Sequence, residues 1–382
     1  MPMRLWLLLP VLALYSVISF AEEQRAFFTV DDVLRAEPVP TAPTVARAQA
    51  GERISARERR GFWRRVELRS GQSGWVRISS VRLFAPGPAA GLAAVSSGRD
   101  ATNNVVLVSG TRSMLGRNAP FDRTSILAAT ADPAVIRSVP SVPYDAASRA
   151  RFAAAGGLVP RKIKLPGPSP IDSPVESSVD PQLAQDEIAA TLFGVAKPIA
   201  DNTLQVYVNQ VGQWVVSRIG GGPQWRFVVV DSPSIISFAL PGGLVIVSSG
   251  LYRLLATEDE LAAVLAREIA HARRGHHLKN LRRPSIETYL RPLDPALEFI
   301  ADEEGMRLAA SAGYDASALI GVLERIAAAA SQGVDVALLR TASPTINDRI
   351  ATLAGAVTPE LESAVVLSAA SARINQYKVG TQ

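Results

Sequence analysis

The sequence contains no cysteine, and this absence excludes several kinds of site together. Disulfide frameworks, thiolate zinc sites, iron–sulfur clusters and cysteine nucleophiles all require thiol groups. Histidine is scarce as well, with only three residues, which are His271, His276 and His277. All three lie in one short segment, so any chemistry that depends on imidazole has to occur there.

Long apolar runs are also scarce, and the one clear example stands at the N-terminus. Arg4 precedes a mainly apolar run from Leu5 to Phe20, and small residues close it at Ala21. This pattern predicts a secretory signal peptide over residues 1–21. A spanning helix needs about 20 apolar residues, so an uncleaved membrane anchor is the alternative. A chain without cysteine suits a bacterial periplasm, so we expect a secreted, periplasmic protein, or a membrane-attached one if the segment is retained.

The overall composition is that of a folded chain. Of 382 residues, 48% are hydrophobic and 20% are charged, which excludes wholesale disorder and a multi-span membrane protein. The length predicts more than one domain. A formal net charge of +5 and a pI near 9.7 favour anionic partners.

Residues 39–84 have the pattern of a small antiparallel barrel. Apolar and polar residues alternate in short runs, and glycines separate the runs. The phrases Gly61-Phe62-Trp63-Arg64-Arg65-Val66 and Gly71-Gln72-Ser73-Gly74-Trp75-Val76 resemble the bacterial SH3-like domain. The resemblance implies an all-β SH3-like module ahead of the rest of the chain.

The basic charge of the protein is concentrated in this module. An anionic cell-wall polymer is the expected partner, because guanidinium groups pair well with carboxylates and phosphates. The alternative is that the arginines simply cover the solvated face of each strand. Nucleic acid is not expected, since a secreted chain would seldom meet it. The nine arginines are Arg53, Arg57, Arg59, Arg60, Arg64, Arg65, Arg69, Arg77 and Arg82, against Glu52, Glu58 and Glu67.

The middle of the chain carries no recognisable chemistry. Residues 85–160 contain an apolar run at 105–108 that predicts a strand, and a predicted helix over residues 146–155. Residues 161–182 are too rich in proline for a helix or sheet interior, so they predict a semi-rigid linker and a domain boundary.

The remaining residues, 183–375, alternate between helical and strand patterns and predict an α+β domain. Apolar residues recur at three- and four-residue intervals over 204–215, which predicts an amphipathic helix. Three strands are predicted next, followed by four helices. The strands are expected at 225–230, 238–240 and 244–248, and the helices at 259–273, 296–312, 316–330 and 346–354.

Part of this domain resembles a known family. The segments Phe238 to Gly243, Ser249 to Leu251 and Glu258 to Ala266 resemble the HtpX/CAAX-prenyl-protease family of zinc metallopeptidases, over about Leu183 to Leu353. The resemblance implies a zincin-like fold and a helix bearing His-Glu-x-x-His. In that motif two imidazoles hold zinc and the glutamate polarises the attacking water. A glutamate from a later helix completes the family's site.

The motif in this chain departs from the family pattern. It reads Arg267-Glu268-Ile269-Ala270-His271, so Glu268 stands at the general-base position, His271 at the second ligand, and Arg267 replaces the first. Comparison with the family's Glu-x-Glu-Ala-Asp places Ile300 at the third-ligand position and Asp302 at the supporting aspartate. Ser343-Pro344 replaces the family's His-Pro, and the motif arginine is retained as Arg349.

An arginine cannot take the place of a zinc ligand. Its guanidinium stays protonated and has no lone pair to donate, so it repels a dication. We therefore expect no cofactor, and zinc only if His271 and Glu303 or Glu304 form a repaired site. Instead, Arg267 is expected to act as a tethered cation that pairs with Glu268, Asp302 or Glu304. The alternative is that its side chain reaches solvent without forming a pair.

These observations predict a catalytically degenerate peptidase homologue that binds peptides, proteins or cell-envelope material. An extended peptide is expected along the strand edge Phe238, Ala239, Leu240, Pro241, Gly242 and Gly243, because strand addition needs only backbone groups and side-chain pockets. The alternative is that the loop over residues 282–295 covers this edge. An active zinc metalloendopeptidase with an atypical site and a cell-wall-binding adaptor are the other two functions under consideration.

Overall fold

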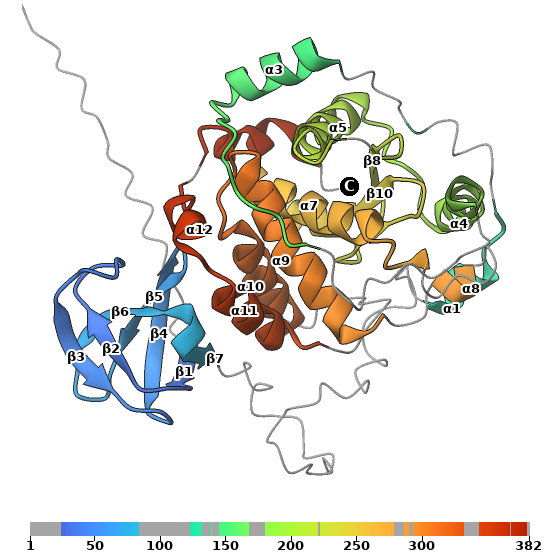
Figure 1. The fold of residues 1–382 in the computed structure, drawn as a ribbon. Helices are drawn as coiled ribbons and strands as arrows, with labels where there is room; N and C mark the ends of the chain where they lie inside the picture. The colour runs from blue at the N-terminus through green and yellow to red at the C-terminus, as the bar shows by residue number, and fades with distance from the viewer. Residues whose placement is uncertain are drawn as a thin grey trace, which may run out of the picture.

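The computed structural model describes residues 24–83, 123–131, 139, 145–167, 180–220, 222–278, 286–289, 293–331, 344–366 and 368–379. The predicted signal peptide and the predicted strand at 105–108 lie outside these residues. The described chain forms an antiparallel β-domain at its N-terminal end and a larger α+β domain at its C-terminal end (Figure 1). No helix of the described residues is long and apolar enough to cross a membrane.

The β-domain is one seven-stranded sheet in the order β3-β2-β6-β5-β4-β1-β7. It includes Gln24–Phe28, which pairs with strands on both sides, so the predicted boundary at residue 39 is too late. Phe28, Leu34 and Val66 form part of its core. Its assignment to the SH3-like class stays a prediction. The strands are β1 (Gln24–Phe28), β2 (Asp32–Arg35), β3 (Thr44–Ala48), β4 (Arg53–Arg60), β5 (Trp63–Glu67), β6 (Ser73–Arg77) and β7 (Val81–Leu83).

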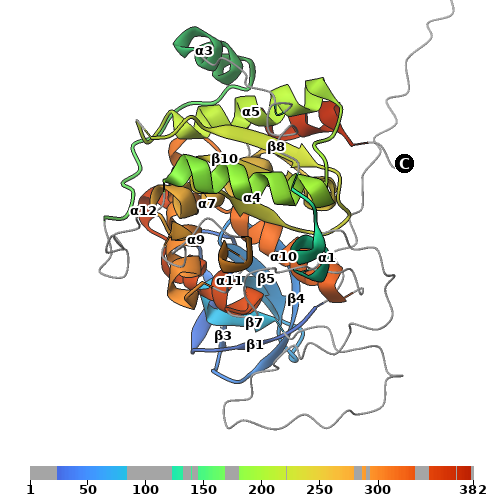
Figure 2. The ribbon, with the colours of Figure 1, turned by 90° about the vertical axis from the view of Figure 1, so that its right-hand side faces the viewer.

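A small mixed sheet lies at the centre of the α+β domain, and the three predicted strands are confirmed. β8 (Arg226–Val230) runs parallel to β10 (Leu244–Ser248), and β9 (Ser237–Ala239) pairs antiparallel with the other side of β10. Helix α4 (Pro181–Val195) covers one face of this sheet, and α5 (Asn202–Val216) and α7 (Glu258–Arg273) cover the other (Figure 2). The strands are mainly apolar because both faces are covered, with Arg226, Ser237 and Ser248 as the exceptions at strand ends.

The helices predicted for the middle region and for the α+β domain are present within a few residues. They are α3 (Ala146–Ala155), α5, α7, α9 (Pro295–Ser311), α10 (Ala318–Ser331) and α11 (Ile346–Gly355). The sequence reading did not predict α1 (Arg123–Ala128), α4, α6 (Ser249–Leu254), α8 (Ile286–Tyr289), α12 (Pro359–Ser363) or the 3-10 helix η4 (Ser371–Tyr377).

Both ends of the predicted proline-rich linker belong to the folded domain. Asp180 caps α4 by accepting hydrogen bonds from the amides of Gln182 and Leu183, and Pro181 occupies the first turn. At the other end, the amide of Arg161 donates to Ser311 O at 2.9 Å, and its guanidinium donates to Tyr314 O at 2.6 Å. The linker prediction therefore does not hold for these two ends.

Helices α7 and α9 pack closely where the candidate site forms. A β-carbon at Gly305 would lie 2.7 Å from Cα of Arg267, which is closer than side-chain atoms pack. Only glycine permits this approach, because it has no side chain. The close crossing places the acidic residues of α9 beside Arg267.

The β-domain is attached to the helical part of the protein by arginine and tryptophan side chains. Arg59 and Arg64 both donate to Glu324 of α10, and Arg59 does so at 2.9 Å. Glu362 of α12 accepts from Trp63 at 3.0 Å and from Arg77 at 2.8 Å. Arg82 donates to Asp348 of α11 at 3.2 Å. Figure 1 shows the blue sheet against the orange-red helices that carry these acids.

Candidate functional site

The cavity of interest lies between α7, α9, α10 and the strand β9. Its volume is about 100 Å³. One side is polar, with Ser237, Arg267, Glu268, His271, His277, Glu298 and Arg349. The other side is apolar, and its α10 part is a stripe at helical spacing, formed by Leu319, Val322, Leu323 and Ile326.

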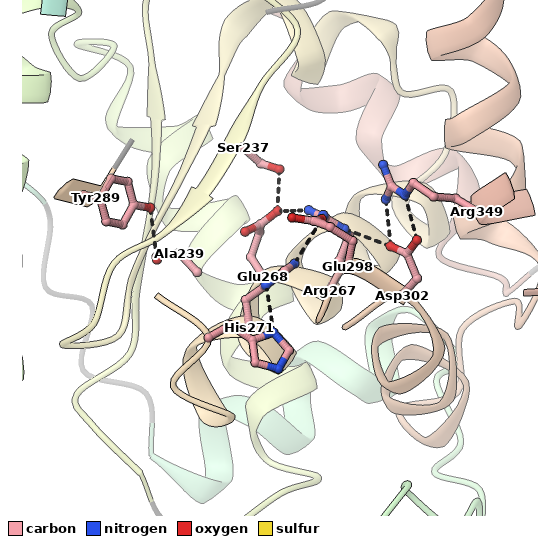
Figure 3. Close-up of polar contacts among 10 residues, drawn as sticks. Ser237, Ala239, Arg267, Glu268, His271, Tyr289, Glu298, Asp302 and Arg349 are labelled. Carbon is pink, nitrogen blue, oxygen red and sulfur yellow. Dashed lines mark hydrogen bonds and ion pairs between the residues drawn. The ribbon is translucent and has the colours of Figure 1, made fainter. Parts of the chain in front are cut away.

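Arg267 is at the centre of the polar side. Its Nη1 donates to Glu268 Oε1 at 2.6 Å, its Nε donates to Asp302 Oδ1 at 2.9 Å, and its Nη2 donates to Glu298. Figure 3 shows the guanidinium between these three carboxylates. The expected ion pairs with Glu268 and Asp302 are therefore present, and the alternative of an unpaired side chain does not hold.

The three carboxylates fix the charge of this cluster. Burial by itself lowers the pKa of Arg267, but Glu298, Glu268 and Asp302 together raise that pKa above its usual value. Burial by itself raises the pKa of Glu298, and the positive charge of Arg267 outweighs this and holds the pKa well below its usual range. The arginine is therefore charged and Glu298 is ionised.

Glu298, and not Ile300, is the residue of α9 that faces the cavity. Its Oε2 is 3.6 Å from Nε2 of His271. Residues four apart share one face of a helix, so Glu298 lies on the face of Asp302, while Ile300 points about 200° away from Glu298. Ile300 is not among the residues that line the cavity. The prediction that Ile300 occupies the third-ligand position is therefore wrong, and Glu298, two residues earlier, occupies it. The spacing of four residues between Glu298 and Asp302 identifies this position from the sequence.

The three histidines come together because α7 ends at Arg273. Gly275 adopts a φ of 62°, which turns the chain back, and the amide of His276 donates to His271 O at 3.1 Å. Nδ1 of His276 is 3.1 Å from Nδ1 of His271, and the His277 ring stacks on His271 with centroids 5.2 Å apart. The turn at Gly275 therefore brings all three imidazoles together, although His276 and His277 lie beyond the end of α7.

Arg349 secures the far end of the carboxylate cluster. It donates to both oxygens of Asp302, each at 2.7 Å. Asp302 therefore bridges Arg267 and Arg349, and it positions both guanidinium groups. Two-pronged pairing of this kind is the strongest form of the arginine–carboxylate contact.

Glu303 and Glu304 do not take part in the site. Glu304 is fully buried and pairs with Arg273 and Arg274, and Glu303 pairs with Arg307 at 3.0 Å. The prediction of a repaired metal site that combines His271 with either glutamate is therefore wrong.

The predicted peptide-binding edge is buried. Phe238, Ala239 and Leu240 are each at most 2% exposed, and Pro241, Gly242 and Gly243 are also buried. The hydroxyl of Tyr289 in α8 donates to Ala239 O at 3.2 Å (Figure 3). The side-chain oxygen of Gln185 accepts from Leu244 N at 2.8 Å, which packs α4 onto the following turn. Within the predicted covering loop of residues 282–295, the described residue Tyr289 makes this contact with the edge, which favours the alternative over an open edge.

The residues at the family's zinc position do not fit a zinc ion. Nε2 of His271 is buried without a hydrogen-bond partner, so one nitrogen donor is available. However, the Arg267 guanidinium already binds Glu268 and Glu298, and it places a positive charge between them. In the described part of the chain, no three His, Asp or Glu side chains are arranged to hold a metal.

The low pKa of Glu298 predicts how stability depends on pH. A carboxylate with a depressed pKa contributes stability above its unfolded pKa of about 4.3, and this contribution is lost as the pH falls further. Below pH 4.3 the Glu298→Gln variant should therefore lose stability less steeply than the wild type, by up to about 1.4 kcal/mol per pH unit. Urea unfolding between pH 3 and 7 measures both slopes, and equal slopes would contradict the ion pair.

Comparisons with known proteins agree with the predicted family. Residues 202–291 match the sequence pattern of Peptidase family M48. The chain is 31% identical over 122 residues to "Beta-barrel assembly-enhancing protease" of Yersinia pestis, which covers 31% of this chain and 25% of that protein. It is 28% identical over 127 residues to "Mitochondrial metalloendopeptidase OMA1" of Arabidopsis thaliana, which covers 28% of this chain and 26% of that protein.

A shorter match gives higher identity. The chain is 37% identical over 71 residues to "Mitochondrial metalloendopeptidase OMA1" of Saccharomyces cerevisiae, covering 18% of this chain and 21% of that protein. The chain thus spans about a quarter of the length of these curated relatives. The matched region contains α5, the three-stranded sheet and α7, which together position Glu268 and His271.

Proposed function

We propose that this chain, which carries a region of Peptidase family M48, is a non-catalytic peptidase homologue whose pocket binds peptide or protein ligands. The observation that carries the proposal is the Arg267 guanidinium bound to both Glu268 and Glu298. A cation that belongs to the chain stands among the side chains that would have to hold zinc. The zincin-like fold and the degenerate site are both part of this proposal.

The chemistry of the remaining residues supports binding without hydrolysis. A water must lose a proton to attack a peptide bond, and bound zinc supplies that activation in this class of enzyme. Glu268 Oε1 already accepts from Ser237 at 2.7 Å and from Arg267 at 2.6 Å. A general base alone contributes only about 10²–10⁴-fold, which is far below the acceleration that peptide hydrolysis needs.

Metal content and hydrolysis measured on the same sample test the proposal. Protein purified without chelator is expected to contain far less than one zinc per chain and to leave casein uncleaved. Glu268→Gln is the control, because it removes the only residue at the general-base position. Stoichiometric zinc, together with cleavage that a chelator and Glu268→Gln both abolish, would establish the alternative of an active metalloendopeptidase.

The cellular location is part of the same proposal. A signal peptide is predicted over residues 1–21, and the name of the Yersinia pestis relative refers to β-barrel assembly. Both support a secreted protein of the bacterial envelope, or a membrane-attached one if the segment is retained.

Binding of an anionic cell-wall polymer by the β-domain is a second candidate function. Four of its arginines, Arg59, Arg64, Arg77 and Arg82, are engaged by the helical domain and are not available for a polymer. Others remain accessible, since the side chains of Arg57, Arg60 and Arg65 are 48%, 64% and 48% exposed. Arg53 and Arg69 are exposed as well, and these five arginines support polymer binding.

Cosedimentation with peptidoglycan tests this second function. Changing Arg53, Arg57, Arg60, Arg65 and Arg69 together to glutamine should reduce the pelleted fraction at low salt, because charge pairing with the polymer is lost. The exposed Arg218→Gln, on the helical domain, is the matched control and should leave pelleting unchanged. Equal pelleting of all three proteins would remove the β-domain from wall binding.

A further inference from the structure

We infer that the cavity accepts a primary ammonium group attached to a short, branched apolar chain, as found at the N-terminus of a peptide that begins with valine or leucine. This inference rests on the proposed function and names the ligand chemistry of the same pocket.

The net charge of the polar side favours a single positive charge. Three carboxylates, Glu268, Glu298 and Asp302, face two guanidinium groups, Arg267 and Arg349. These five side chains together carry one net negative charge. One ammonium group balances that charge. A divalent metal ion would leave an excess positive charge and would meet twice the repulsion from Arg267.

The polar side also has unused hydrogen-bonding capacity of the right kind. Glu268 uses only Oε1 and Glu298 only Oε2 in the contacts described, so the second oxygen of each carboxylate has no partner among the described residues. The side chain of His271 is 2% exposed, and its Nε2 has no hydrogen-bond partner. An ammonium group has three hydrogens, and these three atoms can accept them when the His271 proton is on Nδ1.

The apolar side sets the size of the attached group. Leu319, Val322, Leu323 and Ile326 of α10 line the cavity together with the polar residues. The volume of about 100 Å³ is below the roughly 150 Å³ of an apolar cavity known to hold benzene. A branched chain of three or four carbons suits this volume.

Isothermal titration calorimetry on the full chain at pH 6.5 tests the ligand class. The probes are leucyl-triglycine amide, its N-acetylated form, and 3-methylbutylamine. Acetylation removes the charge and two hydrogen-bond donors, so it should weaken binding at least tenfold. Glu298→Gln should weaken binding of the free amine by a similar factor. Glu303→Gln, on the same helix but outside the cavity, should change it less than twofold.

The amines also identify the source of the ligand. Peptide binding at least tenfold tighter than 3-methylbutylamine assigns the site to peptide N-termini, and comparable binding assigns it to free aliphatic amines. A second variant, Leu323→Ala, should weaken binding of the leucyl peptide more than binding of triglycine amide. This comparison can still be measured if Glu298→Gln does not fold.

Two results would overturn the inference. Equal affinity for the acetylated and free peptides would exclude the ammonium group while leaving peptide binding intact. No heat with either amine would exclude the ligand class altogether. Neither result bears on catalysis, which the zinc and casein measurements decide separately.

Discussion

Replacing Arg267 by alanine is expected to lower the free energy of unfolding by about 3–5 kcal/mol, because a buried ion pair that loses one partner leaves uncompensated charge. Glu268, Glu298 and Asp302 would then face one another, and only Asp302 would retain a guanidinium partner, Arg349. Urea unfolding followed by circular dichroism at pH 7 measures the loss. The effect should be smaller at pH 4, where the carboxylates can take up protons.

Two comparisons isolate the buried charge. Arg218→Ala removes an exposed arginine and should change stability by less than about 0.5 kcal/mol. Arg267→Lys keeps the positive charge but cannot reach three carboxylates in a fixed planar geometry, so it should fall between wild type and alanine. An alanine variant as stable as the wild type would show that the three contacts contribute nothing.

Replacing Arg267 by histidine is expected to create zinc affinity. The substitution puts two imidazoles four residues apart on α7, opposite Glu298, which is the donor set of a three-ligand zinc site. It also removes a positive charge whose repulsion of a unit charge about 4 Å away is roughly 4 kcal/mol at an effective dielectric constant of 20, and about twice that for a dication. For zinc, the repulsion alone corresponds to about 10⁶-fold in affinity.

Equilibrium dialysis with zinc, followed by elemental analysis, measures this gain. Arg267→Gln is the matched control, because it removes the same charge without adding an imidazole. Zinc binding by Arg267→His that exceeds both the wild type and Arg267→Gln is the expected order. If all three proteins bind zinc equally, Arg267 is not what prevents metal binding.

The framework around the site could be predicted from periodicity. Helix α7 and the strands β8, β9 and β10 have strong local patterns, and the structure confirms them within a residue or two. Strand β1 was missed because its sequence, QRAFF, does not alternate in hydrophobicity, and its position depends on partners distant in the chain. Helix α4 was missed because the prolines before it concealed the Asp180-Pro181 start signal.

The site was predicted only in part, and each gap has a physical reason. The pairing of Arg267 with Glu268 and Asp302 could be anticipated from charge and motif position. The role of Glu298 could not be separated from that of Ile300 by motif matching, whereas counting residues back from Asp302 on one helical face separates them. The contact between Tyr289 and Ala239 joins segments 50 residues apart, and no local pattern marks it.

The guanidinium of Arg267 is part of the polypeptide from the moment the chain is synthesised. A charge of this origin does not have to be acquired from the surroundings, cannot be removed by a competing chelator, and is present in every molecule that folds. The pocket should therefore have the same electrostatic character in zinc-starved and zinc-replete cells, unlike a pocket whose positive charge has to be loaded as a metal ion.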